Sequence, residues 1–443
     1  MFGNRRKNAG PAGAGDAVLL VAPPAQAGDD ALNQALVAAA GSDVVALQAG
    51  QVTDKALRDA RAVVALFPEP EALDQLAPRV KAARAGRDDG WPVLVVGLAP
   101  GQLTAFGAWL TRNAPADGID GLRLVVDADP LAVAAALEDR LAPVIGPNVV
   151  AMPVSTEVET TDYKYFYCLS PQLRGLLAQL AELAANGIER VYLLGGPGTG
   201  KTSLAYYFYL ARAQGNFVTV NLTSESTDDK AAMKSLLCGH VAGAFPGAGS
   251  RTGAFAHSRE GVCFLDESHG VSGSVMEVLM EALDSGQYLP YGASAKQPLR
   301  CAVVFASNRT WDTLISQVNL DEHARLGAVI LHLADLSVRQ EDLIAVLAAT
   351  LAGMASKATS WQPPAGLSDE AWALIRDCPW RGNTRALMRV AETAFVSAAT
   401  ERLPLIEADQ VARAMNLWEP AEHASHAIYT RAGDSGLGDA APG

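Results

Sequence analysis

The glycine-rich segment ending at Lys201 constrains the fold of this chain more than any other feature. Residues 195–202 read GGPGTGKT and directly follow the apolar segment 189–194, ERVYLL. Glycines at these positions let the backbone curl so that successive N–H groups point at phosphate oxygens. The run SLAYYFYLARA follows, and the N-terminal end of such a helix adds a partial positive charge. A strand, this loop and a helix together predict a P-loop α/β domain.

The loop predicts its own ligands. Lys201 is expected to reach the β- and γ-phosphates of ATP, and the Thr202 hydroxyl is expected to hold Mg²⁺. The predicted nucleotide-binding residues in this segment are Gly195, Gly196, Pro197, Gly198, Thr199, Gly200, Lys201, Thr202 and Ser203.

A second apolar strand ends in two carboxylates. Residues 261–267 read GVCFLDE, which suits a Walker B pair. Asp266 is expected to bind Mg²⁺, and Glu267 to act as the general base that polarises the attacking water. A third strand, 302–306, leads to Asn308, whose amide can orient that water.

The front third of the chain predicts a separate α/β domain. Short Val/Leu-rich runs at 16–24, 42–50, 61–69, 92–100 and 122–130 alternate with helical segments. Such runs indicate a parallel sheet covered on both faces, and five units make a flavodoxin-like three-layer sandwich. No glycine-rich turn follows the first strand, which disfavours a dinucleotide-binding domain.

This front domain resembles a response-regulator receiver that has lost its acids. Val21–Pro24 stands where a receiver keeps acidic residues, and Leu66–Glu69 stands where its phospho-acceptor Asp is expected. Without those carboxylates we expect neither a Mg²⁺ site nor a phosphoryl acceptor there. The interpretation is a degenerate receiver-like docking or regulatory module; an unusual phosphorylatable domain is the alternative.

Composition excludes several classes of protein. With 35 Lys and Arg against 48 Asp and Glu the net charge is −13, which argues against a surface built mainly for nucleic acid. No apolar run is long enough for a bilayer, so no membrane contact is expected. The first 15 residues lack the apolar core of a signal peptide, and the 5 cysteines lack CxxC spacing, so we expect a cytoplasmic protein without disulfides or a zinc site.

Residues from about 171 to 415 resemble the AAA+ central domain of bacterial enhancer-binding proteins, the sigma-54 activators. Asn221, which ends FVTVN, resembles the residue that restrains the catalytic Glu until a partner is engaged. Residues 380–387, WRGNTRAL, are similar to the family's sensor II motif WPGNVREL, which makes Arg385 a candidate phosphate contact. Arg325 falls where the family has an arginine finger acting across a subunit boundary, and this implies a homo-oligomeric ring, a hexamer or heptamer.

The most diagnostic stretch is GAFPGA, which is similar to the family's GAFTGA loop. That loop moves with nucleotide state and touches the sigma factor. It comprises Gly243, Ala244, Phe245, Pro246, Gly247 and Ala248.

Three departures bear on function. Pro246 replaces the family's Thr, which removes an N–H and a hydroxyl. Asn319 stands where the family usually has a further Arg. After the lid only an Ala/Gly-rich tail follows, so direct DNA binding through a helix-turn-helix is not expected.

These features predict a domain order and leave three functions open. The first is an ATP-driven motor that remodels sigma-54 RNA polymerase without its own DNA-binding domain. The second is the same motor with a client in secretion, assembly or metabolism, and the third is a nucleotide-binding scaffold that hydrolyses little. The expected parts are a flexible tail 1–15, a receiver-like domain 16–145, a linker 146–170, a P-loop AAA+ α/β subdomain 171–333, an α-helical lid 334–417 and a disordered tail 418–443.

Overall fold

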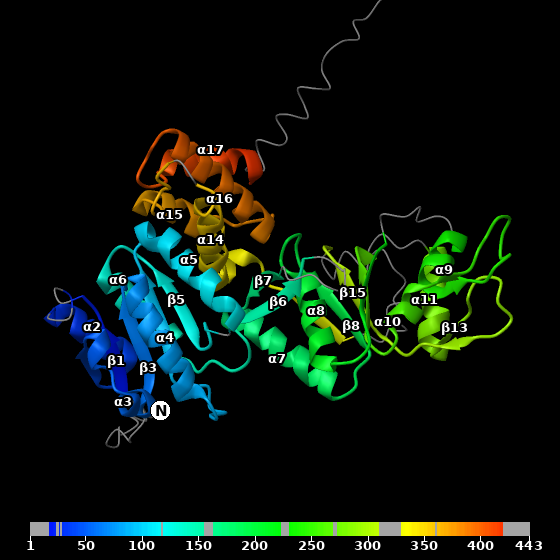
Figure 1. Ribbon diagram of the computed structural model, residues 1–443, viewed down its shortest axis with the longest axis horizontal. Coiled ribbons are helices and arrows are strands. Elements are labelled where there is room, and N and C mark those ends of the chain that lie inside the picture. The colour runs from blue at the N-terminus through cyan, green and yellow to red at the C-terminus, as the bar shows by residue number, and fades with distance from the viewer. Residues whose placement is uncertain are drawn as a thin grey trace, which may run out of the picture.

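The computed structural model describes residues 17–23, 26, 29–116, 118–154, 163–222, 230–268, 273–309, 329–358 and 361–419. Figure 1 shows a front domain beside a lid of helices, with a second α/β unit extending away from both. The expected fold class, a receiver-like sandwich followed by a P-loop α/β domain with a helical lid, is confirmed.

The front domain is built on a parallel sheet of five strands in the order β2-β1-β3-β4-β5. This order is the flavodoxin-like one. Strand β2 is added on one side of β1, and β3, β4 and β5 are added on the other side. The strands are β1 (Ala17–Val21), β2 (Val44–Leu47), β3 (Ala60–Leu66), β4 (Val93–Leu98) and β5 (Leu122–Val126). The helices are α2 (Asp30–Ala40), α3 (Asp54–Asp59), α4 (Pro70–Arg84), α5 (Leu103–Asn113) and α6 (Pro130–Ala135), with short 3-10 turns η1 (Ala49–Gln51), η2 (Pro100–Gln102), η3 (Ala114–Ala116) and η4 (Glu138–Arg140).

Strand β3 explains why the sheet is covered on both faces. Residues Ala62 to Leu66 are all 0% exposed, because successive side chains of a strand point to opposite faces and both faces are apolar. Val63 and Ala65 join one buried cluster, while Ala62, Val64 and Leu66 join the other.

An antiparallel hairpin follows the front domain. Strand β6 (Val149–Pro153) pairs with β7 (Tyr163–Tyr167) along their full length. The sequence predicts only a linker at 146–170, so the paired strands are a difference from that prediction. The hairpin leads into α7 (Pro171–Ala185), the first helix of the second α/β unit.

The second unit contains another parallel five-stranded sheet, in the order β16-β8-β15-β12-β9. Its strands are β8 (Arg190–Leu194), β9 (Phe217–Asn221), β12 (Val262–Asp266), β15 (Ala302–Ser307) and β16 (Val329–His332). Its further helices are α8 (Lys201–Arg212), α9 (Lys230–Cys238), α10 (Ala254–Ser258) and α11 (Gly273–Ser285), and its small ribbons are β10 (Gly239–His240) with β11 (Arg251–Thr252) and β13 (Gln287–Tyr288) with β14 (Gln297–Pro298).

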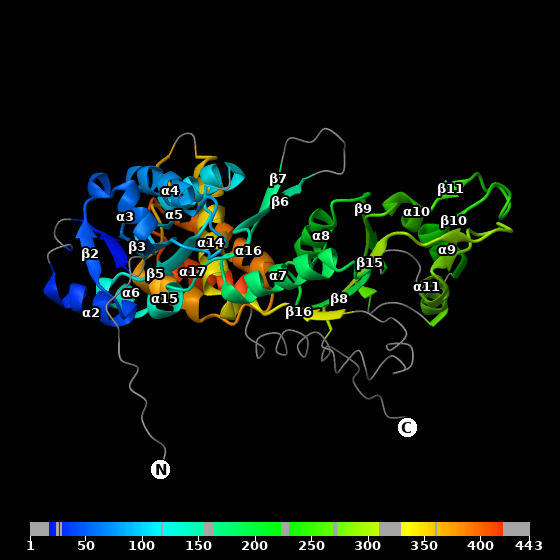
Figure 2. The same ribbon diagram turned by 90° about the horizontal axis from the view of Figure 1, so that it is seen from below.

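The lid is helical. It comprises the 3-10 turn η6 (Leu336–Val338) and helices α14 (Gln340–Ala355), α15 (Asp369–Asp377), α16 (Asn383–Thr400) and α17 (Ala408–Trp418). Figure 2, seen from below, places β10 and β11 at the end of the molecule far from the front domain. Among the described residues no helix is long and apolar enough to cross a membrane, and all five cysteines are free and buried.

Candidate nucleotide site and partner loop

The loop between β8 and α8 has two positions, 198 and 200, whose backbone conformation favours glycine. Gly198 has φ 73° and Gly200 has φ 110°, a region that L side chains rarely adopt. A Cβ on Gly200 would lie 2.5 Å from the Phe166 ring, and one on Gly198 would lie 2.6 Å from the Gly382 carbonyl oxygen. The loop is therefore enclosed by the hairpin on one side and by the lid on the other.

Lys201 begins α8 and its ammonium is folded over the loop. Its Nζ donates to the carbonyl oxygens of Gly195, at 2.8 Å, and Gly196, at 2.9 Å. Burial lowers the pKa of Lys201; the carboxylates of Asp266 and Glu267 oppose this shift and Arg385 adds to it. The ammonium thus faces two carboxylates and one guanidinium.

These groups converge on one cavity of about 190 Å³. Its polar lining combines backbone N–H groups at a helix N-terminus with cationic, hydroxyl and acidic side chains, which is the combination that binds a magnesium–polyphosphate. The predicted residues that line it are Pro197, Gly198, Gly200, Lys201, Thr202, Ser203, Asp266, Glu267 and Arg385. Thr199 lies outside the lining and is fully buried, with its hydroxyl donating to the Gly196 carbonyl at 2.9 Å.

The acidic pair lies where β12 ends. Asp266 is the last residue of the strand, and its Oδ1 accepts a hydrogen bond of 2.9 Å from the Glu267 N–H. Glu267 has φ 54°, a left-handed conformation that costs about 1–3 kcal/mol for a residue other than glycine. Such strain is typical of functional positions, where the surrounding structure imposes it.

Ser268 fixes this turn, although the sequence analysis did not single it out. Its hydroxyl donates to the Ala306 carbonyl at 2.9 Å and lies 2.7 Å from the Tyr192 hydroxyl. It thereby ties the residue after Glu267 to β15, the strand next to β12, and to β8 beyond it. A serine following two acids carries no pattern that would have identified this role.

The two predicted asparagines lie at the ends of β9 and β15, the two strands that flank β12. Asn221 is the last residue of β9 and pairs in register with Asp266. Asn308 directly follows β15 and is exposed. Both therefore lie at the same carboxyl edge of the sheet as the acidic pair, but neither lines the cavity. Arg325 and Asn319 lie outside the described residues.

The lid holds the loop through three residues that the sequence analysis did not assign. The Asn383 amide donates to the Pro197 carbonyl at 3.1 Å, and the Thr384 hydroxyl donates to the Gly198 carbonyl at 2.6 Å. Arg339, which is 2% exposed, donates to the Thr199 carbonyl at 3.0 Å. The motif at 380–387 pointed to Arg385 alone, yet its neighbours make the contacts to the loop backbone.

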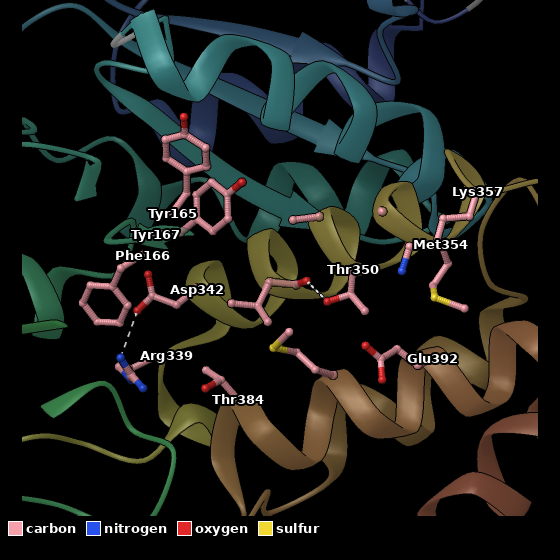
Figure 3. A pocket seen from close by; sticks show the side chains of 14 residues that line it. Tyr165, Phe166, Tyr167, Arg339, Asp342, Thr350, Met354, Lys357, Thr384 and Glu392 are labelled. Carbon is pink, nitrogen blue, oxygen red and sulfur yellow. Dashed lines mark hydrogen bonds and ion pairs between the residues drawn. The ribbon is translucent and has the colours of Figure 1, made fainter. Parts of the chain in front are cut away.

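A second cavity of about 340 Å³ adjoins the first, and Thr384 lines both. Figure 3 shows it between β7, α14 and α16, with Phe166, Arg339 and Asp342 at one end and Lys357 at the other. Most of the lining is apolar or aromatic, including Tyr165 and Tyr167. The Arg339 Nε is buried in this wall without a hydrogen-bond partner in the described part of the chain.

Magnesium fits the donor set of the smaller cavity. Mg²⁺ is usually held by one or two protein oxygens together with phosphates and waters, and Thr202 and Asp266 supply a hydroxyl and a carboxylate. Within the described ranges no three His, Cys, Asp or Glu side chains form a cluster that could hold a metal by themselves.

The GAFPGA segment forms a closed loop between β10 and β11. The Gly243 N–H donates to the Ala248 carbonyl at 3.0 Å, and the Ala248 N–H donates to the Phe245 carbonyl at 2.9 Å. Pro246 and Gly247, whose φ is 80°, occupy the centre of the second turn. Proline followed by a residue with positive φ is typical of a type II turn, so Pro246 stabilises this tip.

Phe245 lies at the tip of this loop and is 43% exposed. Its ring packs 5.0 Å from the His240 ring and 6.3 Å from the Tyr291 ring, between centroids. Backbone hydrogen bonds of 2.8 and 3.1 Å join Tyr291 to Gly239 and Val241. The loop is therefore anchored to a second loop, while the phenyl ring stays partly exposed.

Comparison with known proteins agrees with this geometry. Residues 167–332 match the family described as Sigma-54 interaction domain. The chain is 28% identical over 241 residues to the alginate biosynthesis transcriptional regulatory protein AlgB of Pseudomonas putida, covering 53% of this chain and 52% of that protein. It is 31% identical over 227 residues to the DNA-binding transcriptional regulator NtrC of a Bradyrhizobium species, covering 50% and 46%.

The chain thus spans about half the length of the curated relatives it matches. A crystal structure of NtrX from Brucella abortus aligns with a TM-score of 0.49 and 17% identity over 93% of this chain and 89% of that one. Residues 167–332 therefore resemble a sigma-54 interaction domain, which is an AAA+ P-loop ATPase domain, and the expected resemblance to the sigma-54 activators is confirmed for this part of the chain.

Proposed function

We propose that this ATPase converts ATP turnover into movement of the GAFPGA loop and thereby remodels a protein client, sigma-54 RNA polymerase, during transcription activation. The observation that carries the proposal is the position of Phe245: an apolar side chain, 43% exposed, at the tip of a loop inserted between two strands that end at the nucleotide site. An isolated exposed phenyl ring on a well-formed turn suits a hydrophobic grip.

The nucleotide would lie across both cavities. Its phosphates would meet the loop N–H groups, Lys201 and Arg385, and its base would enter the larger apolar cavity beside Phe166. The shared residue Thr384 supports one ligand spanning the two spaces. Thr202 and Asp266 would hold the Mg²⁺, which supplies charge neutralisation on the phosphates.

Hydrolysis would require groups from two subunits. Glu267 would accept a proton from the attacking water, Asn308 would orient that water, and Asn221 on the neighbouring strand would restrain Glu267. Arg325 would reach the γ-phosphate of an adjacent protomer, so the active assembly is a homo-oligomeric ring, a hexamer or heptamer.

The chain path supports a mechanical link between site and loop. Strand β9 ends in Asn221 and strand β12 ends in Asp266, and the two are paired in register. The segment between these strands, which includes α9, the loop and α10, leaves the sheet at Asn221 beside Asp266 and re-enters it at Val262, the opposite end of β12. A small rearrangement at the Asn221 end would therefore displace the loop tip.

The test is open-complex formation by sigma-54 RNA polymerase on a supercoiled promoter template with the purified protein and ATP. The proposal expects open complexes with ATP and none with ADP. Healthy ATP turnover without open complexes would contradict it.

One observation favours a second client. Pro246 has neither the N–H nor the hydroxyl of the threonine in the family's GAFTGA loop. If those two groups are needed to contact sigma-54, the same motor acts on a different protein complex. The Pro246→Thr variant separates the two cases: if it gains open-complex formation that the unaltered protein lacks, the loop of this chain is adapted to another partner.

A further inference from the structure

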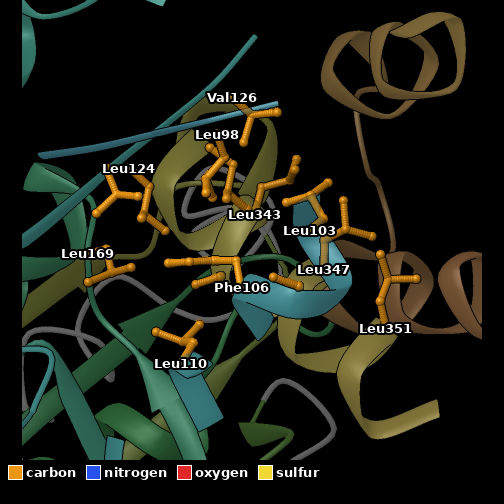
Figure 4. Close-up of a cluster of buried hydrophobic side chains, with 14 of the residues drawn as sticks. Leu98, Leu103, Phe106, Leu110, Leu124, Val126, Leu169, Leu343, Leu347 and Leu351 are labelled. Atoms are coloured by element: carbon orange, nitrogen blue, oxygen red, sulfur yellow. The ribbon is translucent and has the colours of Figure 1, made fainter. Parts of the chain in front are cut away.

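The front domain and the lid share one hydrophobic core. A single buried cluster contains residues of β4, β5 and α5 together with residues of α14, α15 and α16. Figure 4 shows Phe106 of α5 beside Leu343 of α14, and Leu103 of α5 beside Leu347 of α14. The α/β subdomain has its own clusters on the two faces of its sheet, which contain no residue of either the front-domain sheet or the lid helices.

Backbones approach closely at this interface. A Cβ on Gly107 of α5 would lie 1.9 Å from the Ala348 carbonyl oxygen of α14. On the lid side, a Cβ on Gly366 would lie 2.3 Å from the Pro100 carbonyl oxygen of the front domain. Because glycine has no Cβ, the two backbones can approach at these two positions to distances that any other residue would prevent. The front domain and the lid are therefore close-packed against each other in one relative orientation.

Polar groups fix the same interface at its edges. Trp372 of α15 donates from Nε1 to the Val126 carbonyl at 3.2 Å. The Thr104 hydroxyl donates to the Pro364 carbonyl at 3.0 Å. A buried ion pair between Arg123 and Glu341 links β5 to the first turn of α14, with an N–O distance of 2.8 Å.

Contacts between the lid and the α/β subdomain are of another kind. Those of Asn383, Thr384 and Arg339 end on backbone carbonyls of the phosphate-binding loop itself. Asp342 accepts from the N–H groups of Leu169 and Ser170, at the entry to α7. Tyr167 of β7 and Leu169 at the entry to α7 also belong to the shared cluster. The lid is therefore joined to its own subdomain mainly by hydrogen bonds around the nucleotide site, and to the front domain by most of a close-packed core.

We propose that the front domain and the lid are one rigid body, and that nucleotide binding moves the two together relative to the α/β subdomain. A molecule that binds the front domain and favours one orientation of the rigid body relative to the α/β subdomain would then change the affinity for nucleotide. Nucleotide would change the affinity for that molecule by the same factor. The inference goes beyond the proposed function, because it holds whatever the client.

Energy transfer between pairs of dyes on the full chain tests this motion. Labels go on introduced cysteines at three exposed positions: Val37 in α2 of the front domain, Val396 in α16 of the lid and Leu210 in α8 of the α/β subdomain, which are 44%, 51% and 44% exposed. The native cysteines are buried, so labelling is selective.

On saturation with magnesium ADP, we expect transfer to change for Val37–Leu210 and for Val396–Leu210, and to stay constant for Val37–Val396. A change in the Val37–Val396 pair as large as in the other two would overturn the proposal. Constant transfer in all three pairs would overturn it as well, since no hinge would then exist.

A glycine pair supplies matched variants. Gly107→Ala adds one methyl group at the closest approach of α5 and α14, and we expect it to broaden the Val37–Val396 distance distribution and to make it respond to nucleotide. Gly175→Ala lies within α7, where an added Cβ meets nothing within 4 Å, and should leave that distance unchanged. Identical behaviour of the two variants would contradict a rigid joint at Gly107.

Discussion

Arg123 and Glu341 form an ion pair that is buried between two parts of the chain 218 residues apart. The guanidinium Nε and Nη2 donate to the carboxylate at 2.9 and 2.8 Å, and the two side chains are 0% and 1% exposed. The carboxylate also accepts from the Leu124 N–H at 3.2 Å, and Arg123 donates to the Asp139 carbonyl at 3.0 Å. The pair therefore leaves few of its hydrogen-bonding groups unsatisfied.

Removing one partner of this pair should be costly. Arg123→Ala leaves the buried Glu341 carboxylate with only the longer ion pair to Arg140, at 3.5 Å, and loss of one member of a buried pair costs about 3–5 kcal/mol in the free energy of unfolding. Urea denaturation measures it. The double variant Arg123→Met/Glu341→Leu is the control, because apolar residues of similar volume restore packing without a stranded charge. A double variant as unstable as Arg123→Ala would contradict this account.

The buried thiols should be unreactive in the folded protein. Burial raises the pKa of Cys238 and of Cys301 from an ordinary value of 9.0 to about 12. A thiol-specific disulfide reagent at pH 8 should therefore find almost no thiolate in the native protein and all five cysteines after unfolding in denaturant.

The same shifts fix the sign of a pH dependence. A thiol whose pKa is higher in the folded state stabilises the fold fully below its unfolded pKa, and that contribution is lost as pH rises through the folded value. Between about pH 9 and 12 these two cysteines should lower the free energy of unfolding as pH increases. Cys301→Ala should flatten the slope over that window, and an unaltered slope would count against the assignment.

The sequence predicted both sheets because their strands are short, continuous Val- and Leu-rich runs, which are typical of buried parallel strands. It also predicted roles for Lys201, Asp266 and Glu267, and the structure brings these three residues together around one cavity. What it missed depends on tertiary placement. The carbonyl contacts of Arg339 and Asn383 arise only once the lid is folded over the loop, and no local pattern records them.

The shared core of front domain and lid was missed for a related reason. The apolar face of α14 predicts burial but not which surface covers it, and Gly107 reads in sequence as an ordinary helix residue. The sequence predicts a linker where β6 and β7 form a hairpin, because strand pairing is set by contacts between Val149–Pro153 and Tyr163–Tyr167 and not within either strand.

Replacing the proposed general base should separate binding from turnover. Glu267→Gln keeps the shape of the side chain but cannot accept a proton, so we expect steady-state ATP turnover to fall by roughly 10²–10⁴-fold with nucleotide affinity retained. A coupled phosphate-release assay and a fluorescent nucleotide measure the two quantities. Glu182→Gln, on the exposed face of α7, is the control. Unchanged turnover in Glu267→Gln would remove the catalytic assignment.

The predicted finger in trans permits a mixing experiment. Arg325→Ala should lower turnover by roughly 10³–10⁵-fold, the contribution of an arginine finger to phosphoryl transfer. When Arg325→Ala and Glu267→Gln subunits are mixed, some interfaces combine an intact Arg325 from one subunit with an intact Glu267 from the next. Activity should then reappear and reach its maximum near equal proportions. A mixture as inactive as its components would mean that the arginine acts within its own subunit.

Truncating Phe245 should uncouple the motor from its client. The ring touches His240 and Tyr291 but lies far from the nucleotide cavity, so Phe245→Ala should change ATP turnover by no more than about twofold, in line with other exposed substitutions. Open-complex formation by sigma-54 RNA polymerase should fall below detection, because truncating an aromatic anchor at the centre of a contact costs about 2 kcal/mol or more per subunit. Phe245→Tyr keeps the ring and should keep most of the activity. If Phe245→Ala remodels polymerase as well as the unaltered protein does, the grip lies elsewhere on the molecule.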